Sequence, residues 1–194
     1  MNFKHQLFLA ALFVITALVS CGKKDSDTPF GLTNIYIPQA TTSNGTDVNY
    51  LVPSGLDSNT YNYKVDAANN KVNVFLGVTR SGKQESSGYS VNVITRADTV
   101  NQLIASGQIK VNPNAGKNVV LLPGNAYTLP STLTVPSGQY MANFNLSIDL
   151  AKLKTYAGQK VALCVAITNP SMYTLSSTFN KVIIIIDVDA LKLT

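Results

Sequence analysis

The stretch Lys71-Val72-Asn73-Val74-Phe75-Leu76-Gly77-Val78 decides the fold class, because apolar side chains recur in it at every second position. This period of two is that of an extended strand with one face in a core and the other toward solvent. The same alternation returns in Tyr89-Ser90-Val91-Asn92-Val93-Ile94 and in residues 140–148, and the turn-forming pairs Asn69-Asn70 and Ser81-Gly82 separate the runs. The spacing of runs and turns predicts an all-β protein built as an antiparallel β-sandwich.

The sequence also predicts further strands and one or two short connecting helices. The remaining strand candidates are residues 34–37, 61–65, 119–122, 133–135, 161–168 and 182–188. Asp98 can cap a helical turn that Gly107 ends, and residues 149–153 are a second short helix candidate. Residues 182–186 are apolar on both faces, so we expect a central strand that is covered on both sides.

The composition indicates a polar surface with few charges. The chain has 194 residues, of which 13% are charged, and a formal net charge of +5. That charged share is about half of the ~25% typical of soluble domains. The arginines are Arg80 and Arg96 alone. Because nucleic-acid binding depends on clustered basic groups, no nucleic-acid partner is predicted.

The N-terminus has the features of a lipoprotein leader. Residues 7–19 form an apolar run after Lys4. The run is too short to span a membrane, which needs about 20 residues, and it fits the apolar region of a signal peptide. Leu18-Val19-Ser20-Cys21 resembles the lipobox of bacterial lipoproteins, in which the cysteine is lipidated and becomes the first residue. We expect a signal peptide at residues 1–20, lipidated Cys21 with a flexible tether over residues 21–32, and a single β-sandwich domain at residues 33–194.

The inventory of reactive side chains argues against an enzyme. Cleavage before Cys21 would remove His5, the only histidine, so a serine triad and a zinc site would lack their imidazoles. Cys164 lies in an apolar run, where a free cysteine behaves as a small core residue. Asp187 and Asp189 fit solvated strand-end carboxylates, with a calcium site as the alternative. No catalytic residue, metal or cofactor is predicted.

Tyrosines are the candidate ligand-binding residues. Tyr61 and Tyr63 are expected to share one strand face with Tyr89 and Tyr50 nearby, and aromatic faces of this kind stack on sugar rings. The alternative is that these tyrosines pack at the rim of the sandwich. Arg80 begins Arg80-Ser81-Gly82 and is interpreted as the stem of a hairpin, paired with Glu85 or Asp98.

The order and spacing of several blocks resemble a known family. The blocks are Asn34-Ile35-Tyr36-Ile37-Pro38-Gln39-Ala40, residues 74–82, residues 89–93, Leu121-Leu122-Pro123 through Tyr127, and Leu133-Thr134-Val135-Pro136-Ser137-Gly138. With the lipobox leader, residues 33–188 resemble the N-terminal domain of unknown function of Bacteroidetes surface lipoproteins. The resemblance implies an immunoglobulin-like β-sandwich on the outer membrane, often encoded near glycan-uptake machinery. In many family members the domain precedes a lectin-like or glycoside-hydrolase family 18-like domain, and the family has no assigned catalytic residues.

Two functional hypotheses follow. The first is a non-catalytic lipoprotein, anchored in the outer membrane and exposed at the cell surface, that binds glycan or acts as a scaffold in a glycan-acquisition system. Its expected partners are the membrane, through the lipid on Cys21, and glycans or glycan-uptake proteins. The alternative is a fimbrillin-like pilus or adhesin subunit, which would donate residues 182–186 as a strand to a neighbouring subunit.

Overall fold

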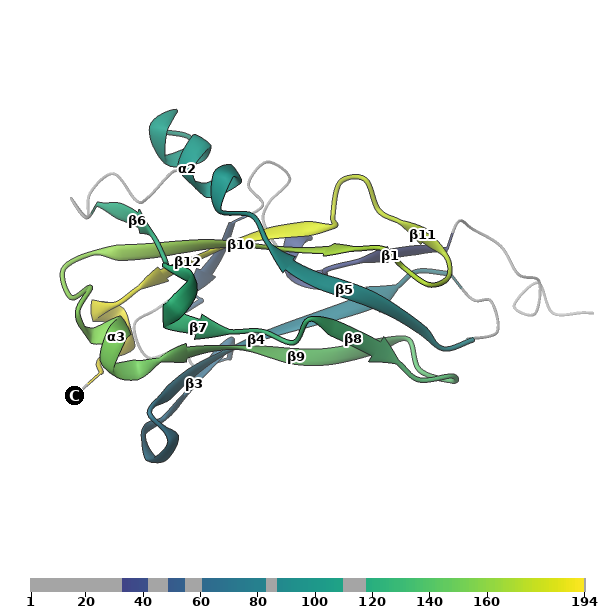
Figure 1. The fold of residues 1–194 in the computed structure, drawn as a ribbon, viewed down its shortest axis with the longest axis horizontal. Coiled ribbons are helices and arrows are strands. Elements are labelled where there is room, and N and C mark those ends of the chain that lie inside the picture. Colours follow the sequence, from purple (N-terminus) through teal and green to yellow (C-terminus); the bar gives the residue numbers. More distant parts are fainter. Residues whose placement is uncertain (1–32, 42–48, 55–60, 83–86, 110–117, 194) are drawn as a thin grey trace, which may run out of the picture. The chain divides into compact units, whose positions relative to one another are not determined.

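The computed structural model describes residues 33–41, 49–54, 61–82, 87–109 and 118–193, all within one compact unit, Leu32–Thr194. The leader, Cys21 and the tether lie outside the described residues, so the expectations for residues 1–32 remain predictions. The described strands form two six-stranded sheets (Figure 1).

Each sheet has a long central pair of strands. The first sheet has the order β11 (Thr174–Leu175), β1 (Asn34–Tyr36), β4 (Lys71–Arg80), β9 (Met141–Asp149) and β7 (Tyr127–Thr128), and β3 (Tyr63–Asp66) also pairs with β4. The second sheet has the order β2 (Asn49–Val52), β12 (Lys181–Asp187), β10 (Lys160–Thr168), β5 (Tyr89–Thr95) and β8 (Thr132–Val135), and β6 (Val119–Leu121) also pairs with β10.

This order confirms the all-β, immunoglobulin-like sandwich. The path β1-β4-β9-β7 corresponds to strands A-B-E-D of an immunoglobulin domain, and β12-β10-β5 corresponds to G-F-C. Most pairs are antiparallel, as predicted. The pairs β1 with β11, β6 with β10 and β2 with β12 are parallel, which the alternation pattern did not indicate because it carries no information on strand direction.

Two short α-helices connect strands, as expected. In α3 (Leu150–Lys154), the side chain of Asp149 caps the helix by accepting a hydrogen bond from the Lys152 N–H at 3.0 Å. In α2 (Ala97–Ala105), the prediction that Asp98 is the cap is wrong, because the helix already begins after Arg96 and Asp98 lies in its first turn. Gly107 follows the helix with a φ of +65°, a conformation that favours glycine at a helix end. Short 3₁₀ turns occur at η2 (Pro38–Ala40), η3 (Ala67–Asn69), η5 (Gly124–Ala126) and η6 (Asp189–Leu191).

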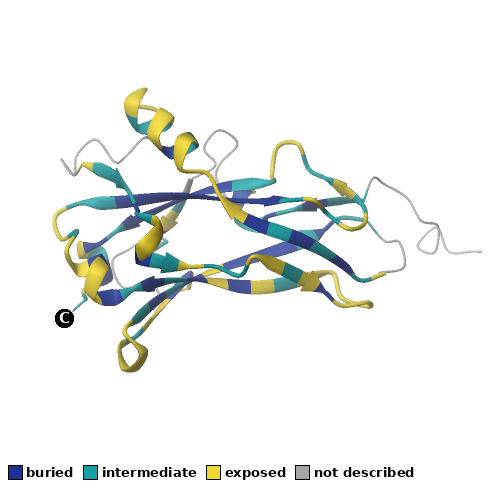
Figure 2. Cartoon of the chain, in the orientation of Figure 1, coloured by how far each residue is buried: buried dark blue, intermediate teal, exposed yellow. Residues whose placement is uncertain are grey.

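The main core lies between the sheets, and a second cluster covers the outer face of the second sheet. Val182, Ile184 and Ile186 of β12 belong to the main core. Ile183 and Ile185 point the other way, into a cluster that contains Val100 of α2. The prediction that residues 182–186 form a central strand covered on both sides is therefore confirmed, and Figure 2 shows the buried strands between exposed connections.

The position of β12 also bears on the pilus alternative. This strand pairs with β10 on one side and with β2 on the other, so it does not lie at an edge of its sheet. The expectation that residues 182–186 serve as a detachable donor strand is corrected, because both ladders and both core clusters would have to be broken to release them.

The strand termini define two opposite ends of the sandwich. At one end, β1 begins and β4 finishes at Arg80, which lies beside the start of β9. At the other end, the 3₁₀ turn η6 and the C-terminal residues lie beside α3 (Figure 1). Among the described residues, we find no helix of sufficient length and hydrophobicity to span a membrane.

Candidate functional site

An aromatic ring on the outer face of the first sheet is the centre of the candidate site. Along β4, Val72, Val74 and Leu76 face the core, so Phe75 points to the outer, solvated face. Its side chain is 37% exposed. The outward-facing positions of this alternating run are otherwise polar or small, and Phe75 is an apolar exception among them. This exception was the sequence signal that could have identified Phe75.

Polar side chains lie around Phe75, both on β4 itself and on the neighbouring strands. Asn145 of β9 is its direct cross-strand partner and is exposed. Beside this pair, Asn73 faces Ser147, whose hydroxyl donates a hydrogen bond to Asn73 Oδ1 at 2.6 Å. Lys64 of β3 pairs with Asn73 from the other side. Because directly opposed residues on one sheet face have neighbouring side chains, these amides and the ammonium group lie around one ring.

The ring also borders an open hollow at the edge of β3. The hollow has a volume of about 560 Å³ and is lined by Tyr63, Lys64, Val65, Phe75 and Leu191. Its lining combines aromatic and aliphatic surface with one basic side chain. The site can therefore contact an apolar face and offer hydrogen bonds from amide and ammonium groups, which is the chemistry of a binding surface.

The structure separates the tyrosines that the sequence placed together. Tyr61 lies in the turn before β3 and is 87% exposed, whereas Tyr63 is buried in the main core beneath the same strand. Tyr50 is half-buried, and its hydroxyl donates a hydrogen bond to the Phe75 carbonyl at 3.3 Å. Burial raises the pKa of Tyr50. The expectation that Tyr61 and Tyr63 share one strand face is wrong. Strand β3 begins only at Tyr63, whose ring faces the core, and Tyr61 lies before the strand.

Asn62 has a structural role between these tyrosines. Its Nδ2 donates to the Leu51 carbonyl at 2.6 Å, and its Oδ1 accepts a hydrogen bond from the Ser54 N–H at 3.2 Å. The amide is buried and joins the segment after β2 to β3. It positions the turn that carries Tyr61.

Tyr89 belongs to a different cluster, at the end of the sandwich where β1 begins. Its ring packs edge-on against Tyr173 with centroids 5.6 Å apart, and its hydroxyl donates to the Tyr140 carbonyl at 3.5 Å. Burial is the main cause that raises the pKa of Tyr89 to about 12. Tyr89 starts β5 in the second sheet, so its ring contributes to the core and not to a surface shared with Tyr61.

Arg80 is the centre of that cluster. Its guanidinium carbon lies 5.0 Å from the ring centroid of Tyr140 and 5.4 Å from that of Tyr173. The side chain is buried against these two rings, whereas the sequence interpretation was a hairpin stem paired with Glu85 or Asp98. Glu85, one of its predicted partners, lies outside the described residues. The two tyrosines come from distant segments, so no local pattern could have indicated these cation–π contacts.

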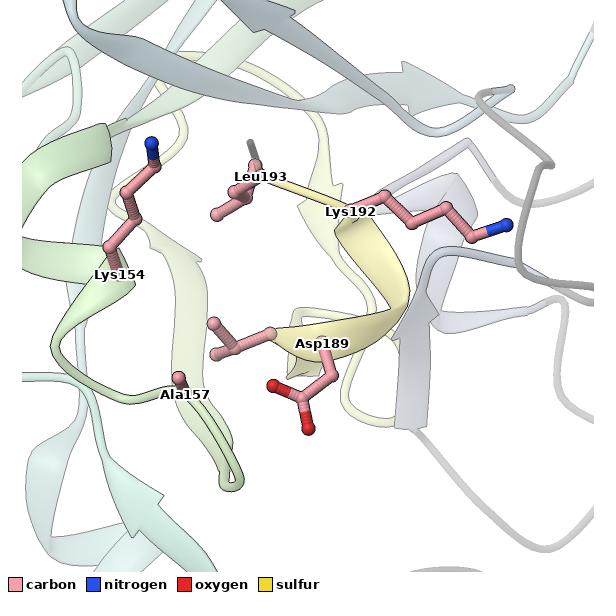
Figure 3. A pocket seen from close by; sticks show the side chains of 6 residues that line it. Lys154, Ala157, Asp189, Lys192 and Leu193 are labelled. Carbon is pink, nitrogen blue, oxygen red and sulfur yellow. The ribbon is translucent and has the colours of Figure 1, made fainter.

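A second hollow lies at the C-terminal end of the sandwich (Figure 3). It has a volume of about 380 Å³ and is lined by Lys154, Ala157, Val188, Asp189, Lys192 and Leu193. Asp189 accepts a hydrogen bond from the Gly158 N–H at 2.9 Å, and Asp187 forms an ion pair with Lys160 at 3.6 Å. These carboxylates thus stabilise the chain end. The described residues contain no group of three histidine, cysteine or acidic side chains that could hold a metal ion.

Cys164 occupies the core cluster beneath α2, as expected from its apolar run. Burial raises the pKa of its thiol to about 11. A thiol with this pKa is protonated at neutral pH, and the neutral form is a poor nucleophile.

Fold and site together define an immunoglobulin-like β-sandwich module with a polar, aromatic-centred sheet face. A family model described as an N-terminal domain matches residues 32–174. The chain belongs to this family, the N-terminal immunoglobulin-like domains of unknown function that its sequence resembles.

The solved structures that this chain resembles include three proteins of Bacteroides species. One, a candidate carbohydrate binding protein of Bacteroides ovatus, shares 17% identity at a TM-score of 0.49 and aligns with 79% of this chain and 36% of its own length. A multidomain protein of Bacteroides ovatus that includes DUF1735 shares 19% identity at a TM-score of 0.47, with 80% of this chain and 45% of that one covered. An auxiliary nutrient binding protein of Bacteroides thetaiotaomicron shares 19% identity at a TM-score of 0.43, with coverages of 69% and 45%.

This chain spans less than half the length of each of these three structures. No curated protein matches the sequence.

Proposed function

We propose that the protein is a non-catalytic lipoprotein of the outer membrane, anchored by a lipid on Cys21, whose sandwich is exposed at the cell surface and binds glycan for a glycan-acquisition system. The single observation that carries the binding role is Phe75, a half-exposed ring among amide side chains on a solvated sheet face.

The lipid anchor is supported by the sequence before the domain. Leu18-Val19-Ser20-Cys21 follows an apolar run of signal-peptide length. Family membership supports the same context, because the resemblance implies surface lipoproteins. Multiple acyl chains on one cysteine would hold the protein firmly on a membrane, whereas a single chain gives only marginal binding.

A role without catalysis is supported by the state of the reactive groups. The Cys164 thiol is buried with a raised pKa, and the carboxylates of Asp187 and Asp189 are engaged in an ion pair and a backbone hydrogen bond. Glycoside hydrolysis commonly needs two carboxyl groups about 5–9.5 Å apart across the scissile bond. The lining of the hollow beside Phe75 contains no carboxylate.

The Phe75 surface has the features of a sugar-binding face. The C–H face of a pyranose is apolar and packs on an aromatic ring, while its hydroxyls need donors and acceptors around that ring. Asn145 supplies an exposed amide directly across from Phe75, and Lys64 adds donors on the other side. The carbonyl of Asn62 accepts a hydrogen bond from the Phe75 N–H at 2.9 Å. The exposed Tyr61 immediately precedes Asn62 in the chain, so this bond ties the segment that carries Tyr61 to the backbone at Phe75.

A glycan array tests the binding role. The protein with Cys21→Ser, which has no acylation site, should retain a subset of polysaccharides, and Phe75→Ala or Asn145→Ala should lower that retention by at least tenfold. Ile94→Ala is the matched control, because Ile94 is also 37% exposed but lies on β5 of the other sheet. Absence of retention by the parent protein, or equal retention by Phe75→Ala and Ile94→Ala, would overturn the proposed site.

A further inference from the structure

The end of the sandwich where β1 begins is formed by connections that contact one another. Ser171 and Ser90 exchange two hydrogen bonds of 2.9 Å, and the Tyr173 hydroxyl donates to the Ser87 carbonyl at 3.2 Å. Gly88 is packed so closely on the β8–β9 turn that a Cβ atom there would lie 2.9 Å from Ser137 N. We call this surface the entry end; its described residues are 33–34, 81–82, 87–90, 136–141 and 169–174.

The entry end is partly apolar, and the Arg80 guanidinium beneath it is buried. None of its described residues is Lys, Arg, Asp or Glu, and residues 83–86, with Lys83 and Glu85, lie outside the described part of the chain. Tyr140, Met141 and Met172 are 55%, 47% and 43% exposed. Because the Tyr140 and Tyr173 rings both contact the buried Arg80 guanidinium, Tyr140 and the segment containing Met172 are held near each other.

The opposite end of the sandwich differs sharply in charge. Its described residues include Asp66, Lys71, Asp149, Lys152, Lys154, Lys160, Asp187, Asp189 and Lys192. Most ionisable side chains in the described part of the chain therefore lie at this opposite end, so the low overall charge does not by itself explain their scarcity at the entry end.

We propose that the entry end rests on the lipid bilayer, with Tyr140, Met141 and Met172 in the interfacial region. The inference depends on the lipid anchor at Cys21 that forms part of the proposed function. Tyrosine is enriched at membrane–water interfaces because its ring is apolar and its hydroxyl is polar, and the flexible methionine side chain adapts to irregular apolar surroundings. Because the described entry-end residues include no charged side chain, placing this part of the surface against lipid costs less than burying the opposite end would.

Chain length favours this end of the domain over the other. Eleven residues lie between Cys21 and Thr33, and a chain of that length spans at most about 40 Å. The ten-residue strand β4 is itself about 33 Å long at a rise of about 3.3 Å per residue. To bring the charged end to the membrane, the segment after Cys21 would have to run back along the sandwich close to full extension. The entry end reaches the bilayer without this constraint.

Tryptophan fluorescence tests the proposal, because the natural sequence contains no tryptophan and a single introduced one is an unambiguous reporter. Tyr140→Trp keeps an aromatic ring beside Arg80, and Met172→Trp is a second reporter on another segment. Tyr61→Trp is the control, because Tyr61 is highly exposed beside β3 and away from the entry end. Each acylated protein is purified from membranes and reconstituted into vesicles of phosphatidylethanolamine and phosphatidylglycerol with brominated acyl chains.

We expect both entry-end reporters to be quenched at least twofold relative to vesicles without bromine, and Tyr61→Trp to change by less than a tenth. Equal quenching at all three positions, or none at the entry end, would overturn the proposal. A blue shift at Tyr140→Trp without bromine quenching would indicate a protein partner or a second copy and would also contradict it.

The intact mass of each sample distinguishes a failure of the lipid anchor from a failure of the bilayer contact. An acylated Cys21 combined with unquenched entry-end reporters rejects the bilayer contact alone. An unmodified Cys21 thiol rejects the anchor and the bilayer contact with it.

Discussion

Replacing Ile184 by alanine should strongly destabilise the domain, because Ile184 is buried in the middle of β12 and faces the main core. The substitution removes three carbon atoms, which at about 0.8 kcal/mol each amounts to roughly 2.4 kcal/mol of lost transfer free energy. The cavity left in a tightly packed core adds to this loss, so we expect a decrease of about 3–4 kcal/mol in the free energy of unfolding.

Urea unfolding of the Cys21→Ser protein, followed by tyrosine fluorescence and circular dichroism, measures this loss. Ile94→Ala is the matched control: the same three atoms are removed from a half-exposed side chain of the same sheet, at an expected cost of about 1 kcal/mol or less. The denaturant dependence should be the same in both variants. A cost for Ile184→Ala within 0.5 kcal/mol of the control would refute the central position of β12 and restore it as a candidate donor strand.

Three further outcomes follow from the structure. Cys164 should react with a thiol reagent at pH 8 far more slowly in the folded protein than in urea, and equal rates would contradict its burial. Asp149→Ala should lower the urea midpoint more than Asp98→Ala, because only Asp149 caps its helix; equal midpoints would contradict that assignment. Alkaline pH should destabilise the fold, because the pKa values of Cys164 and Tyr89 are higher in the folded protein than in the unfolded chain. As the pH rises, the unfolded chain therefore loses these protons first, and unfolding becomes more favourable. The loss should begin near pH 9 and extend to about pH 12, and Cys164→Ala should remove its lower part; a midpoint that does not change from pH 8 to 11 would contradict this.

Strands with strong alternation could be predicted from the sequence because their pattern reflects burial directly. Residues 71–78 and 140–148 became the central strands β4 and β9, with the expected inner faces. The short strands β2, β7 and β11 were not predicted. Each has only two to four residues and is defined by a partner distant in the chain, such as β12 for β2. A local pattern carries no information about such a partner.

The site was harder to predict than the fold. Tyr63 and Phe75 are both aromatic residues in alternating runs, and only the position of the core shows that the first is buried and the second exposed. Phe75 could have been identified as an apolar residue in the polar half of its run. The Arg80 cluster could not, because Tyr140 and Tyr173 approach it from segments 60 or more residues away in the chain. The helix cap at Asp98 failed for a different reason, since the exact start of a helix depends on the backbone of the preceding residue.

Mass spectrometry of the protein isolated from cell membranes tests directly whether a lipid on Cys21 anchors the sandwich. We expect an N-terminal peptide that begins at Cys21 and carries acyl groups. A peptide with a free Cys21 thiol, or one that still includes residues before Cys21, would contradict it.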